Sequence, residues 1–331
     1  MKADFRALKP EDTGRSATDR FARDVLDGLS MEPKETRPVW LYDERGSALY
    51  QQITETEDYY LTRCEREILA EHGPDLAARL GRRPFNLVDL GAGDGRKTAL
   101  LLRSLLDQGV PFTYVPVDIS VEAMRQLTGS LTREFDRTAL EVKGLIADYF
   151  DALRWVKRTE GAGTVVLFLG SNIGNFDAIQ GQAFLRSLRS ALHEGDRLLI
   201  GSDLKKDPRV IERAYDDKGG ITRKFNLNLL ERMNRELGAD FDPGRFVYRS
   251  YYDVRRGAVE SWLISTRAQQ VHVGALGRRF SFREWEGIHT ESSRKYSRDE
   301  IGRMAAEAGF TVEGDFMDGR GYFVDSLWRA R

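Results

Sequence analysis

The stretch between residues 85 and 101, which reads FNLVDLGAGDGRKTALL, constrains the fold more than any other part of the chain. An apolar run ends in Asp89, three glycines follow at alternate positions from Gly91, and Lys97 opens a second apolar run with helical spacing. We therefore expect a strand, a tight turn and a helix. Glycines at such a turn adopt positive φ and let the backbone approach a ligand. The free N–H groups of the helix start favour a polar or anionic ligand.

The spacing of the glycines distinguishes between two kinds of nucleotide-binding turn. Dinucleotide-binding proteins carry G-x-G-x-x-G. This chain instead has G-x-G-x-G, which begins two residues after Asp89. That spacing disfavours a nicotinamide dehydrogenase. It resembles the first motif of the class I S-adenosylmethionine-dependent methyltransferases. The alternative for this stretch alone is a structural turn without a ligand.

Polar residues also follow the other predicted strands. Apolar runs at 112–118, 140–146 and 164–169 have the character of buried parallel strands. Their ends carry Asp118, Asp148, Tyr149 and Asn175. Ligands of open parallel sheets bind at the carboxyl ends of the strands, where an acid ending the second strand accepts hydrogen bonds from ribose hydroxyls. The strand ends therefore predict a nucleoside-binding edge.

The alternation of strands and helices predicts a doubly wound α/β sheet, and it breaks after residue 205. Residues 206–294 contain a helical stretch, FNLNLLERMNRELG, followed by strand-like segments, and we interpret them as an inserted, smaller α+β substrate lobe. We assign the tyrosine-rich residues 1–62 to the same lobe, with a loop at Gly46 and Ser47. Residues 63–205 and 295–331 then form the Rossmann-like domain. The last of these segments is expected to close as a helix and a strand pair.

Composition excludes several classes of function. The 331 residues include 51 basic and 52 acidic ones, and a net charge of -1 gives no general attraction to nucleic acid or to an anionic membrane. Cys64 is the single cysteine, so no intramolecular disulfide can form. The sequence contains no C-x-x-C or H-x-x-x-H spacing that would suit a metal. It also contains no apolar signal core and no apolar run of membrane-spanning length. We expect a cytoplasmic monomer without a metal.

Several longer segments resemble one family closely. They are LYDERGSALYQQIT, VDLGAGDGRKT, FLGSNIGNF, YDDKGGIT with FNLNLLERMNRELGADFD, and HTESSRKYS. These segments, which extend from Tyr42 to the end, resemble the histidine-specific Nα-methyltransferases that make trimethylhistidine (hercynine) in the first step of ergothioneine biosynthesis. The resemblance implies a class I methyltransferase domain with a smaller lobe. It also implies S-adenosylmethionine as the methyl donor and L-histidine, with its methylated intermediates, as the acceptor.

The resemblance also implies roles for individual residues. Gly91 and Lys97 would contact the methyl donor, with the lysine near the donor's carboxylate. Asp118 would bind the ribose, and Asp148 and Tyr149 the adenine. Tyr42 would line the reaction centre as the catalytic position. The residues that would bind histidine are Tyr59, Asn175, Tyr215, Glu291 and Ser293.

Side-chain chemistry agrees with these roles for a free amino acid. Asn175 and Tyr215 can donate hydrogen bonds to its carboxylate. Glu291 can accept from an imidazole N–H, with Ser293 two residues further on sharing the ring. Otherwise Glu291 would be a surface carboxylate paired with Arg294 or Lys295. The implied reaction is direct displacement at the sulfonium methyl, with solvent, or Tyr42 through water, removing the amine proton.

One position departs from the family pattern. Where well-known members have a methionine beside the imidazole, the segment VESWLIS places Ser261. A smaller side chain there leaves a second hypothesis open, in which the protein is a relative that methylates a tryptophan derivative or a thiohistidine. A non-catalytic cofactor-binding protein is a third hypothesis, although all five expected acceptor residues are present.

Overall fold

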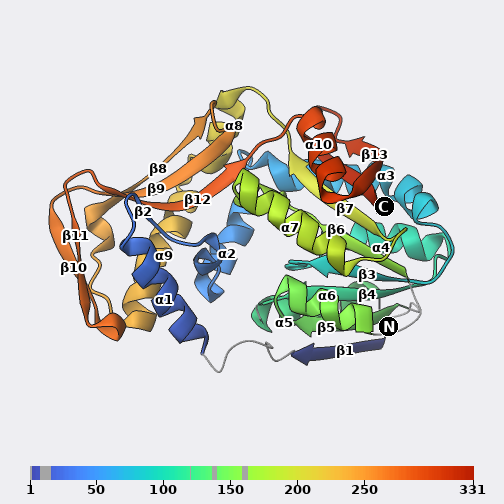
Figure 1. The fold of residues 1–331 in the computed structure, drawn as a ribbon, viewed down its shortest axis with the longest axis horizontal. Coiled ribbons are helices and arrows are strands. Elements are labelled where there is room, and N and C mark those ends of the chain that lie inside the picture. Colours follow the sequence, from blue (N-terminus) through green and yellow to red (C-terminus); the bar gives the residue numbers. More distant parts are fainter. Residues whose placement is uncertain (1, 8–15, 120, 136–139, 159–162) are drawn as a thin grey trace. The chain divides into compact units, whose positions relative to one another are not determined.

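The computed structural model describes residues 2–7, 16–119, 121–135, 140–158 and 163–331. The chain forms two compact units. Unit 1 comprises Met1–Asp12, Leu61–Lys205 and Lys295–Arg331. Unit 2 comprises Thr13–Tyr60 and Lys206–Arg294. Each unit is therefore assembled from segments that are distant in the sequence (Figure 1).

Unit 1 contains an eight-stranded sheet in the order β1-β5-β4-β3-β6-β7-β14-β13. The strands are β1 Lys2–Ala7, β3 Phe85–Leu90, β4 Phe112–Asp118, β5 Glu141–Ile146, β6 Gly163–Phe168, β7 Arg197–Asp203, β13 Phe310–Met317 and β14 Phe323–Ala330. Neighbours from β1 to β7 pair in parallel, whereas β14 is antiparallel to both β7 and β13. The predicted strand pair at the C-terminus is therefore a hairpin that extends the sheet.

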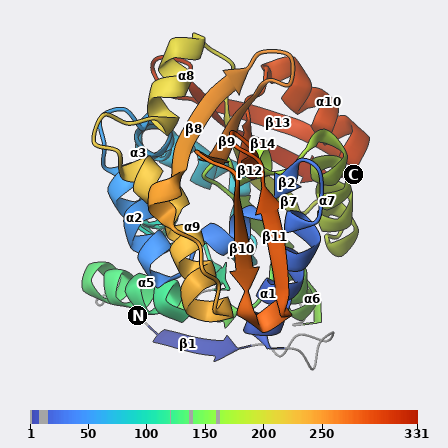
Figure 2. The same cartoon turned by 90° about the vertical axis from the view of Figure 1, so that its left-hand side faces the viewer.

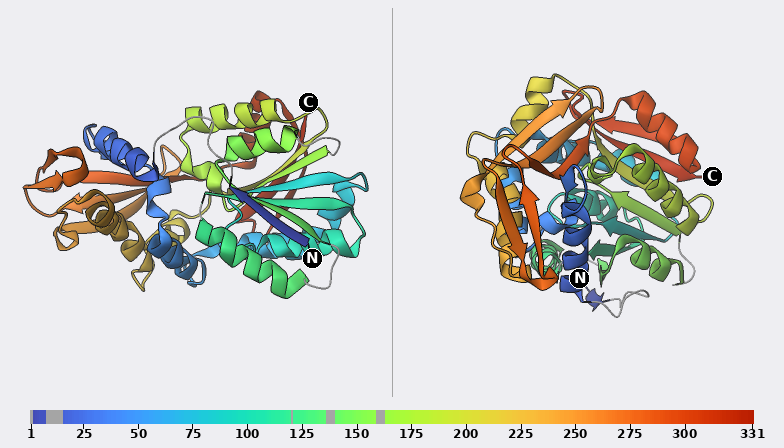
Figure 3. Two further views of the ribbon diagram at one scale, coloured as in Figure 1. Left: turned by 90° about the horizontal axis from the view of Figure 1, so that it is seen from below. Right: turned by 60° about the vertical axis from the view of Figure 1, so that its left-hand side comes forward.

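Helices cover both faces of this sheet (Figure 3). They are α3 Tyr60–Leu80, α4 Thr98–Asp107, α5 Val121–Phe135, α6 Tyr149–Arg158, α7 Ala178–Ala191 and α10 Arg298–Ala308, with a short 3-10 helix η2 at Asn172–Asn175. Residues of α6, α7 and α10 share one buried apolar cluster with the central strands, so these three helices cover the same face. Ser297 caps α10 and forms a capping box, and Gly309 ends that helix at φ 89°.

The direction in which strands are added reverses between β3 and β6. From β3 the sheet grows through β4 to β5 on one side, and from β6 to β7 on the other. In doubly wound sheets such a switch point leaves a crevice at the carboxyl ends of the two strands, and ligands bind there. The glycine turn follows β3 and Gly170 follows β6, so both loops lie at the switch point.

The predicted assignment of residues 1–62 to the smaller lobe is wrong for their first part. Lys2–Ala7 forms β1 and pairs in parallel with β5 at the edge of the unit 1 sheet. The edge of a sheet presents unpaired N–H and C=O groups, with which a segment distant in the sequence can pair. A polar N-terminus therefore gave no signal of this pairing.

Unit 2 is built around a four-stranded sheet in the order β2-β12-β9-β8 and a hairpin of β10 and β11 (Figure 2). Its strands are β2 Lys34–Glu35, β8 Phe246–Asp253, β9 Ala258–Ser265, β10 Gln269–Val273, β11 Arg278–Phe282 and β12 Gly287–Arg294. Its helices are α1 Ala17–Leu29, η1 Pro38–Leu41, α2 Glu44–Thr54, α8 Pro208–Tyr215, α9 Ile221–Leu237, η3 Pro243–Arg245 and η4 Gly274–Leu276. The lobe is of the α+β type that we expected.

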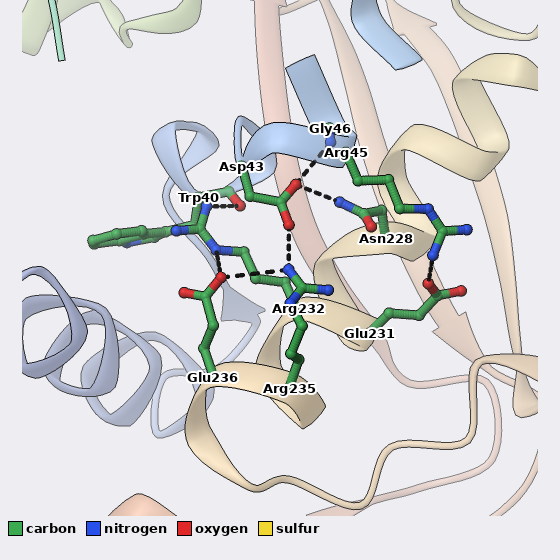
Figure 4. A network of polar contacts seen from close by, with 9 residues as sticks. All are labelled: Trp40, Asp43, Arg45, Gly46, Asn228, Glu231, Arg232, Arg235 and Glu236. Atoms are coloured by element: carbon green, nitrogen blue, oxygen red, sulfur yellow. Dashed lines mark hydrogen bonds and ion pairs between the residues drawn. The ribbon is translucent and has the colours of Figure 1, made fainter. Parts of the chain in front are cut away.

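Asp43 connects the N-terminal segment of unit 2 to helix α9 (Figure 4). Its Oδ1 accepts from the Gly46 N–H at 2.7 Å, which caps α2, and from the Asn228 amide at 2.8 Å. Its other oxygen pairs with Arg235. Gly46 thus lies inside the first turn of α2, so the predicted loop there is wrong. A Cβ at Gly46 would lie 1.8 Å from the Leu41 carbonyl oxygen, so close packing explains this glycine.

We expect Asp43→Ala to destabilise unit 2 by about 2–4 kcal/mol, because it removes a helix cap and leaves the buried Asn228 amide without its acceptor. The measurement is denaturant unfolding. Asp207→Ala is the matched control, since Asp207 also caps a helix, α8, but at an exposed position. Equal losses in the two variants would show that the contact with Asn228 contributes nothing.

Candidate active site

The turn after β3 has the backbone geometry that its glycines predict. Gly91, Gly93 and Gly95 have φ of 77°, 57° and 71°. The N–H groups of Gly91 and Ala92 donate to the Val117 carbonyl at 2.8 and 3.2 Å, which ties the turn to β4. Because L-residues with a Cβ rarely adopt this conformation, the turn requires glycine.

A buried carboxylate fixes the two ends of this turn. Asp89, the last polar residue of β3, accepts from the Thr98 hydroxyl at 2.7 Å and from the Tyr114 hydroxyl at 2.8 Å. Thr98 begins α4 and Tyr114 lies in β4, so one side chain joins two strands and the following helix. Burial raises the pKa of Asp89, and the two hydroxyl donors oppose that shift. The sequence identified Asp89 as the end of a strand but gave no sign of its two partners.

The residues predicted to bind the nucleoside lie at the ends of β4 and β5. Asp118 ends β4, and the Gly93 N–H points to its Oδ2 at 3.4 Å. Tyr149 begins α6 directly after β5, and its hydroxyl would lie 3.1 Å from a Cβ at Gly91. Burial and the charge of Asp118 raise the pKa of Tyr149, so its hydroxyl stays protonated. These strand ends therefore place an acceptor and an aromatic ring beside the glycine turn.

Asp148 has a structural contact that the sequence did not predict. Its Oδ1 accepts from the Asp151 N–H at 2.8 Å and so caps α6. The pKa of Asp151 is raised by burial and by Asp148. An adenine amino group would therefore compete with, or add to, a helix cap at this position.

Lys97 lies at the start of α4 and faces the loop after β6. Its ammonium pairs with Glu65, which is buried on α3. The same ammonium lies 3.4 Å from the position that a Cβ at Gly170 would take. Asn175, predicted to contact the acceptor, ends η2 in this same loop and is half-buried. Unit 1 thus holds all five predicted donor-binding residues and one predicted acceptor residue.

Unit 2 holds the remaining predicted residues, and several of them are in contact. The Tyr215 hydroxyl lies 2.8 Å from the Ser293 hydroxyl in a buried position. The rings of Tyr215 and Tyr59 are 6.2 Å apart in an edge-on arrangement. Tyr59 comes from the N-terminal segment, Tyr215 from the end of α8 and Ser293 from β12. Residues separated by more than two hundred positions in the sequence thus form one layer.

Glu291 lies on β12 directly opposite Ser261 of β9. The Ser261 hydroxyl is 3.2 Å from the Tyr248 hydroxyl, which also donates to the Tyr215 carbonyl at 2.9 Å. Burial raises the pKa of Tyr248, with a contribution from the charge of Glu291. The alternative partner considered for Glu291, Lys295, pairs with Asp203 at 2.9 Å in the interior of unit 1.

Tyr42 lies in a cluster of aromatic rings. It packs edge-on against Tyr50 at 5.4 Å and against Phe225 of α9 at 5.3 Å. The hydroxyls of Tyr50 and Tyr59 are 3.4 Å apart. Burial and the neighbouring tyrosines raise the pKa of Tyr59 well above its ordinary value. At neutral pH the Tyr59 hydroxyl is therefore a hydrogen-bond donor and not a base.

Three residues that contact the predicted site residues were not predicted from the sequence. Tyr248 and Phe225 contact predicted site residues, and Glu65 pairs with Lys97. Tyr248 could have been found from the alternation of β8, because it shares a face with Ser250, whose register partner on β9 is Ser261. Glu65 gave no such signal, since a single acid in a helix is normally exposed. Within the described ranges no cluster of His, Cys, Asp or Glu suits a metal ion, and no helix could span a membrane.

The fold and the strand-end residues define a class I, S-adenosylmethionine-type methyltransferase. Unit 1 combines an open, largely parallel sheet, a glycine turn at its switch point and an acid ending the next strand, which are the features that nucleoside-binding α/β folds use. Residues 21–330 match the family described as histidine-specific methyltransferase, SAM-dependent. The chain belongs to that family and is an S-adenosylmethionine-dependent methyltransferase.

Individual relatives agree with this assignment. A histidine N-alpha-methyltransferase of Mycobacterium tuberculosis is 37% identical over 299 residues, which are 90% of each chain. One of Mycolicibacterium smegmatis is 35% identical over 312 residues, covering 94% of this chain and 95% of the relative. Ergothioneine biosynthesis protein 1 of Neurospora crassa is 33% identical over 304 residues, which are 90% of this chain and 34% of that protein.

The glycine turn yields a prediction about stability. A Cβ at Gly95 would lie 2.1 Å from Leu127 Cδ1, whereas one at Gly93 would meet nothing within 4 Å. We expect Gly95→Ala to cost about 2–4 kcal/mol through strain and overpacking together, and Gly93→Ala about 1–2 kcal/mol through strain alone. Denaturant unfolding of both variants measures the difference. Equal losses would contradict the steric role of Gly95.

Proposed function

We propose that this protein transfers three methyl groups from S-adenosylmethionine to the α-amine of L-histidine, which gives hercynine, the precursor of ergothioneine. The observation that carries this proposal is the buried layer of unit 2. Its Tyr215–Ser293 hydroxyl pair and the neighbouring carboxylate Glu291 suit an amino acid with a polar ring. Membership of the histidine-specific family supports the choice of imidazole as that ring.

The donor-binding roles rest on the geometry of unit 1. A Cβ at Gly91 would crowd the Tyr149 hydroxyl, so the glycine lets the turn lie close to this tyrosine. Asp118 would accept from the ribose hydroxyls, and Tyr149 would pack against the adenine with Asp148 near its amino group. Lys97 would face the donor's carboxylate. The bound donor supplies an electrophilic methyl group on a sulfonium.

The acceptor-binding roles follow the polarity of histidine. Glu291 would accept from an imidazole N–H, with Ser293 beside the ring. Tyr215 and Asn175 would donate to the amino acid's carboxylate, and Tyr59 would enclose it. The reaction would be direct displacement at the sulfonium methyl, and most of its acceleration would come from positioning the two reactants.

The amine must lose its proton before each transfer. The raised pKa of Tyr59 means that its hydroxyl does not remove this proton as a base. Tyr42 would pass the proton to solvent through water. We also propose that the protein acts as a cytoplasmic monomer.

Incubation of the protein with labelled S-adenosylmethionine and a panel of the twenty amino acids tests the function. We expect label in histidine, and mass spectrometry should show the trimethylated species at completion with all three groups on the α-nitrogen. Methylation of a ring nitrogen, or a preference for another amino acid such as tryptophan, would contradict the proposal.

The two ends of the substrate can be tested separately. Glu291→Leu should lower kcat/KM for histidine about fivefold to hundredfold, because it leaves a ring N–H without its acceptor. It should also relax the penalty against rings that lack a matching donor. Asn175→Ala should weaken all amino acids together, because they share the carboxylate.

The measurement is the ratio of kcat/KM for histidine over tryptophan in wild type and in both variants. We expect the ratio to fall in Glu291→Leu and to stay constant in Asn175→Ala. The reverse pattern would mean that the two ends of the substrate have been assigned the wrong way round.

A further inference from the structure

Unit 1 contains two buried carboxyl groups that are close to each other. Asp325 lies on β14 opposite Gly201 of β7 and is 0% exposed. Glu65 reaches the same place from α3 and is 1% exposed. A Cβ at Gly201 would lie 2.3 Å from Glu65 Oε1 and 3.1 Å from Asp325 Oδ1. The absence of a side chain at Gly201 thus creates the space in which the two carboxyl groups meet.

The partners of the two groups are unequal. Glu65 accepts from the Gly170 N–H at 2.7 Å with Oε1 and pairs with Lys97 through Oε2. Among the residues that the structure describes, no donor reaches either oxygen of Asp325. Two acceptors side by side in the interior can form a hydrogen bond only if one of them carries a proton.

Charge balance identifies which group carries the proton. Lys97 supplies one positive charge, which balances one carboxylate, and a second buried carboxylate beside the first is strongly unfavourable. Glu65 has the ammonium and the amide as donors, so Glu65 is the ionised group and Asp325 the acid. Burial raises the pKa of Asp325, the charge of Glu65 adds to the shift, and Lys97 opposes it. Asp89 also faces this cluster, and burial raises the pKa of Asp89 too.

We propose that Glu65 and Asp325 share one proton and form a positioning pair that holds the Lys97 ammonium at the end of β6 for the carboxylate of the methyl donor. The inference rests on the proposed donor-binding role of Lys97 and extends it to two residues that do not touch the donor. Glu65 restrains a long, flexible side chain that would otherwise lose much of its rotamer freedom on binding. Asp325 donates to Glu65 and keeps it in the rotamer that meets Lys97.

The test compares two ligands. S-adenosylhomocysteine carries the donor's amino-acid group, and 5′-methylthioadenosine has the nucleoside and sulfur without it. In calorimetry, Glu65→Gln should lower the affinity for S-adenosylhomocysteine about tenfold or more, the range for a charge-assisted contact. The affinity for 5′-methylthioadenosine should stay within about twofold of the wild-type value. Lys97→Met should produce the same loss, and the double variant no further loss, because both act through one contact.

Glu71→Gln is the matched control, since Glu71 is an exposed acid on the same helix, and it should change neither affinity. An unchanged affinity ratio in Glu65→Gln, or additive losses in the double variant, would overturn the positioning role. No histidine is involved, so a wrong acceptor leaves this test intact. Wild-type protein that binds neither ligand would overturn the donor site itself, and this inference with it.

Substitutions at Asp325 test the shared proton. Asp325→Asn keeps a donor for Glu65 and cannot ionise, so it should retain the preference for S-adenosylhomocysteine, whereas Asp325→Leu should lose that preference. Infrared spectroscopy of the wild type should show the C=O stretch of a buried carboxylic acid, and Asp325→Asn should lack it. Loss of the preference in both variants, or absence of the band from the wild type, would overturn the assignment.

Stability provides a second readout with a definite sign. A carboxyl group whose pKa is raised on folding binds its proton more tightly in the folded state. Its contribution to the free energy of unfolding is therefore lost as the pH rises from its pKa in the unfolded state to its pKa in the folded state. Asp325→Asn removes this loss. The free energy of unfolding of Asp325→Asn relative to wild type should therefore increase from mildly acidic to neutral pH. A constant difference would show that Asp325 is already ionised in the folded protein.

Discussion

The hydrogen bonds of Asp89 are the interaction on which the glycine turn of unit 1 depends. Three glycines of the turn from β3 to α4 have positive φ. Glycines alone do not select one conformation of the turn, because they can adopt many. Asp89 fixes both ends of that turn by bonding Thr98 of α4 and Tyr114 of β4. Because the carboxylate is buried, loss of either hydroxyl would leave it underbonded at considerable cost. The glycines provide the freedom to turn, and Asp89 selects one conformation.

The features that the sequence predicts well are those with short-range causes. Positive φ at Gly91 and the strand ending in Asp118 each depend on a few neighbouring residues. Contacts between distant segments were not predictable in this way. β1 joins the sheet by pairing with β5, which is distant in the sequence, and Gly46 lies in a helix with the Leu41 carbonyl packed against it. The roles of the individual site residues remain predictions.

Glu65 and Asp325 illustrate the same limit at the site. Nothing near Glu65 in the sequence distinguishes it from the exposed acids of α3, and Asp325 lies in an otherwise ordinary strand. Their proximity depends on the antiparallel placement of β14 beside β7, which puts Asp325 opposite a glycine. A buried acid pair next to a cation therefore arises from topology, and only the assembled sheet reveals it.

Ser261 makes polar contacts in the structure, whereas its small size alone suggested only extra space in the pocket. Its hydroxyl contacts Tyr248, and its strand partner is Glu291, so the position extends a line of polar groups and does not simply leave an apolar gap. An indole ring placed there would bury a large apolar face against hydroxyls, with a single N–H to offer them. Imidazole has two nitrogen atoms and a much smaller apolar surface. If the acceptor ring lies beside Ser261, as the family resemblance implies, the polar groups of β8, β9 and β12 favour imidazole over the indole of a tryptophan derivative.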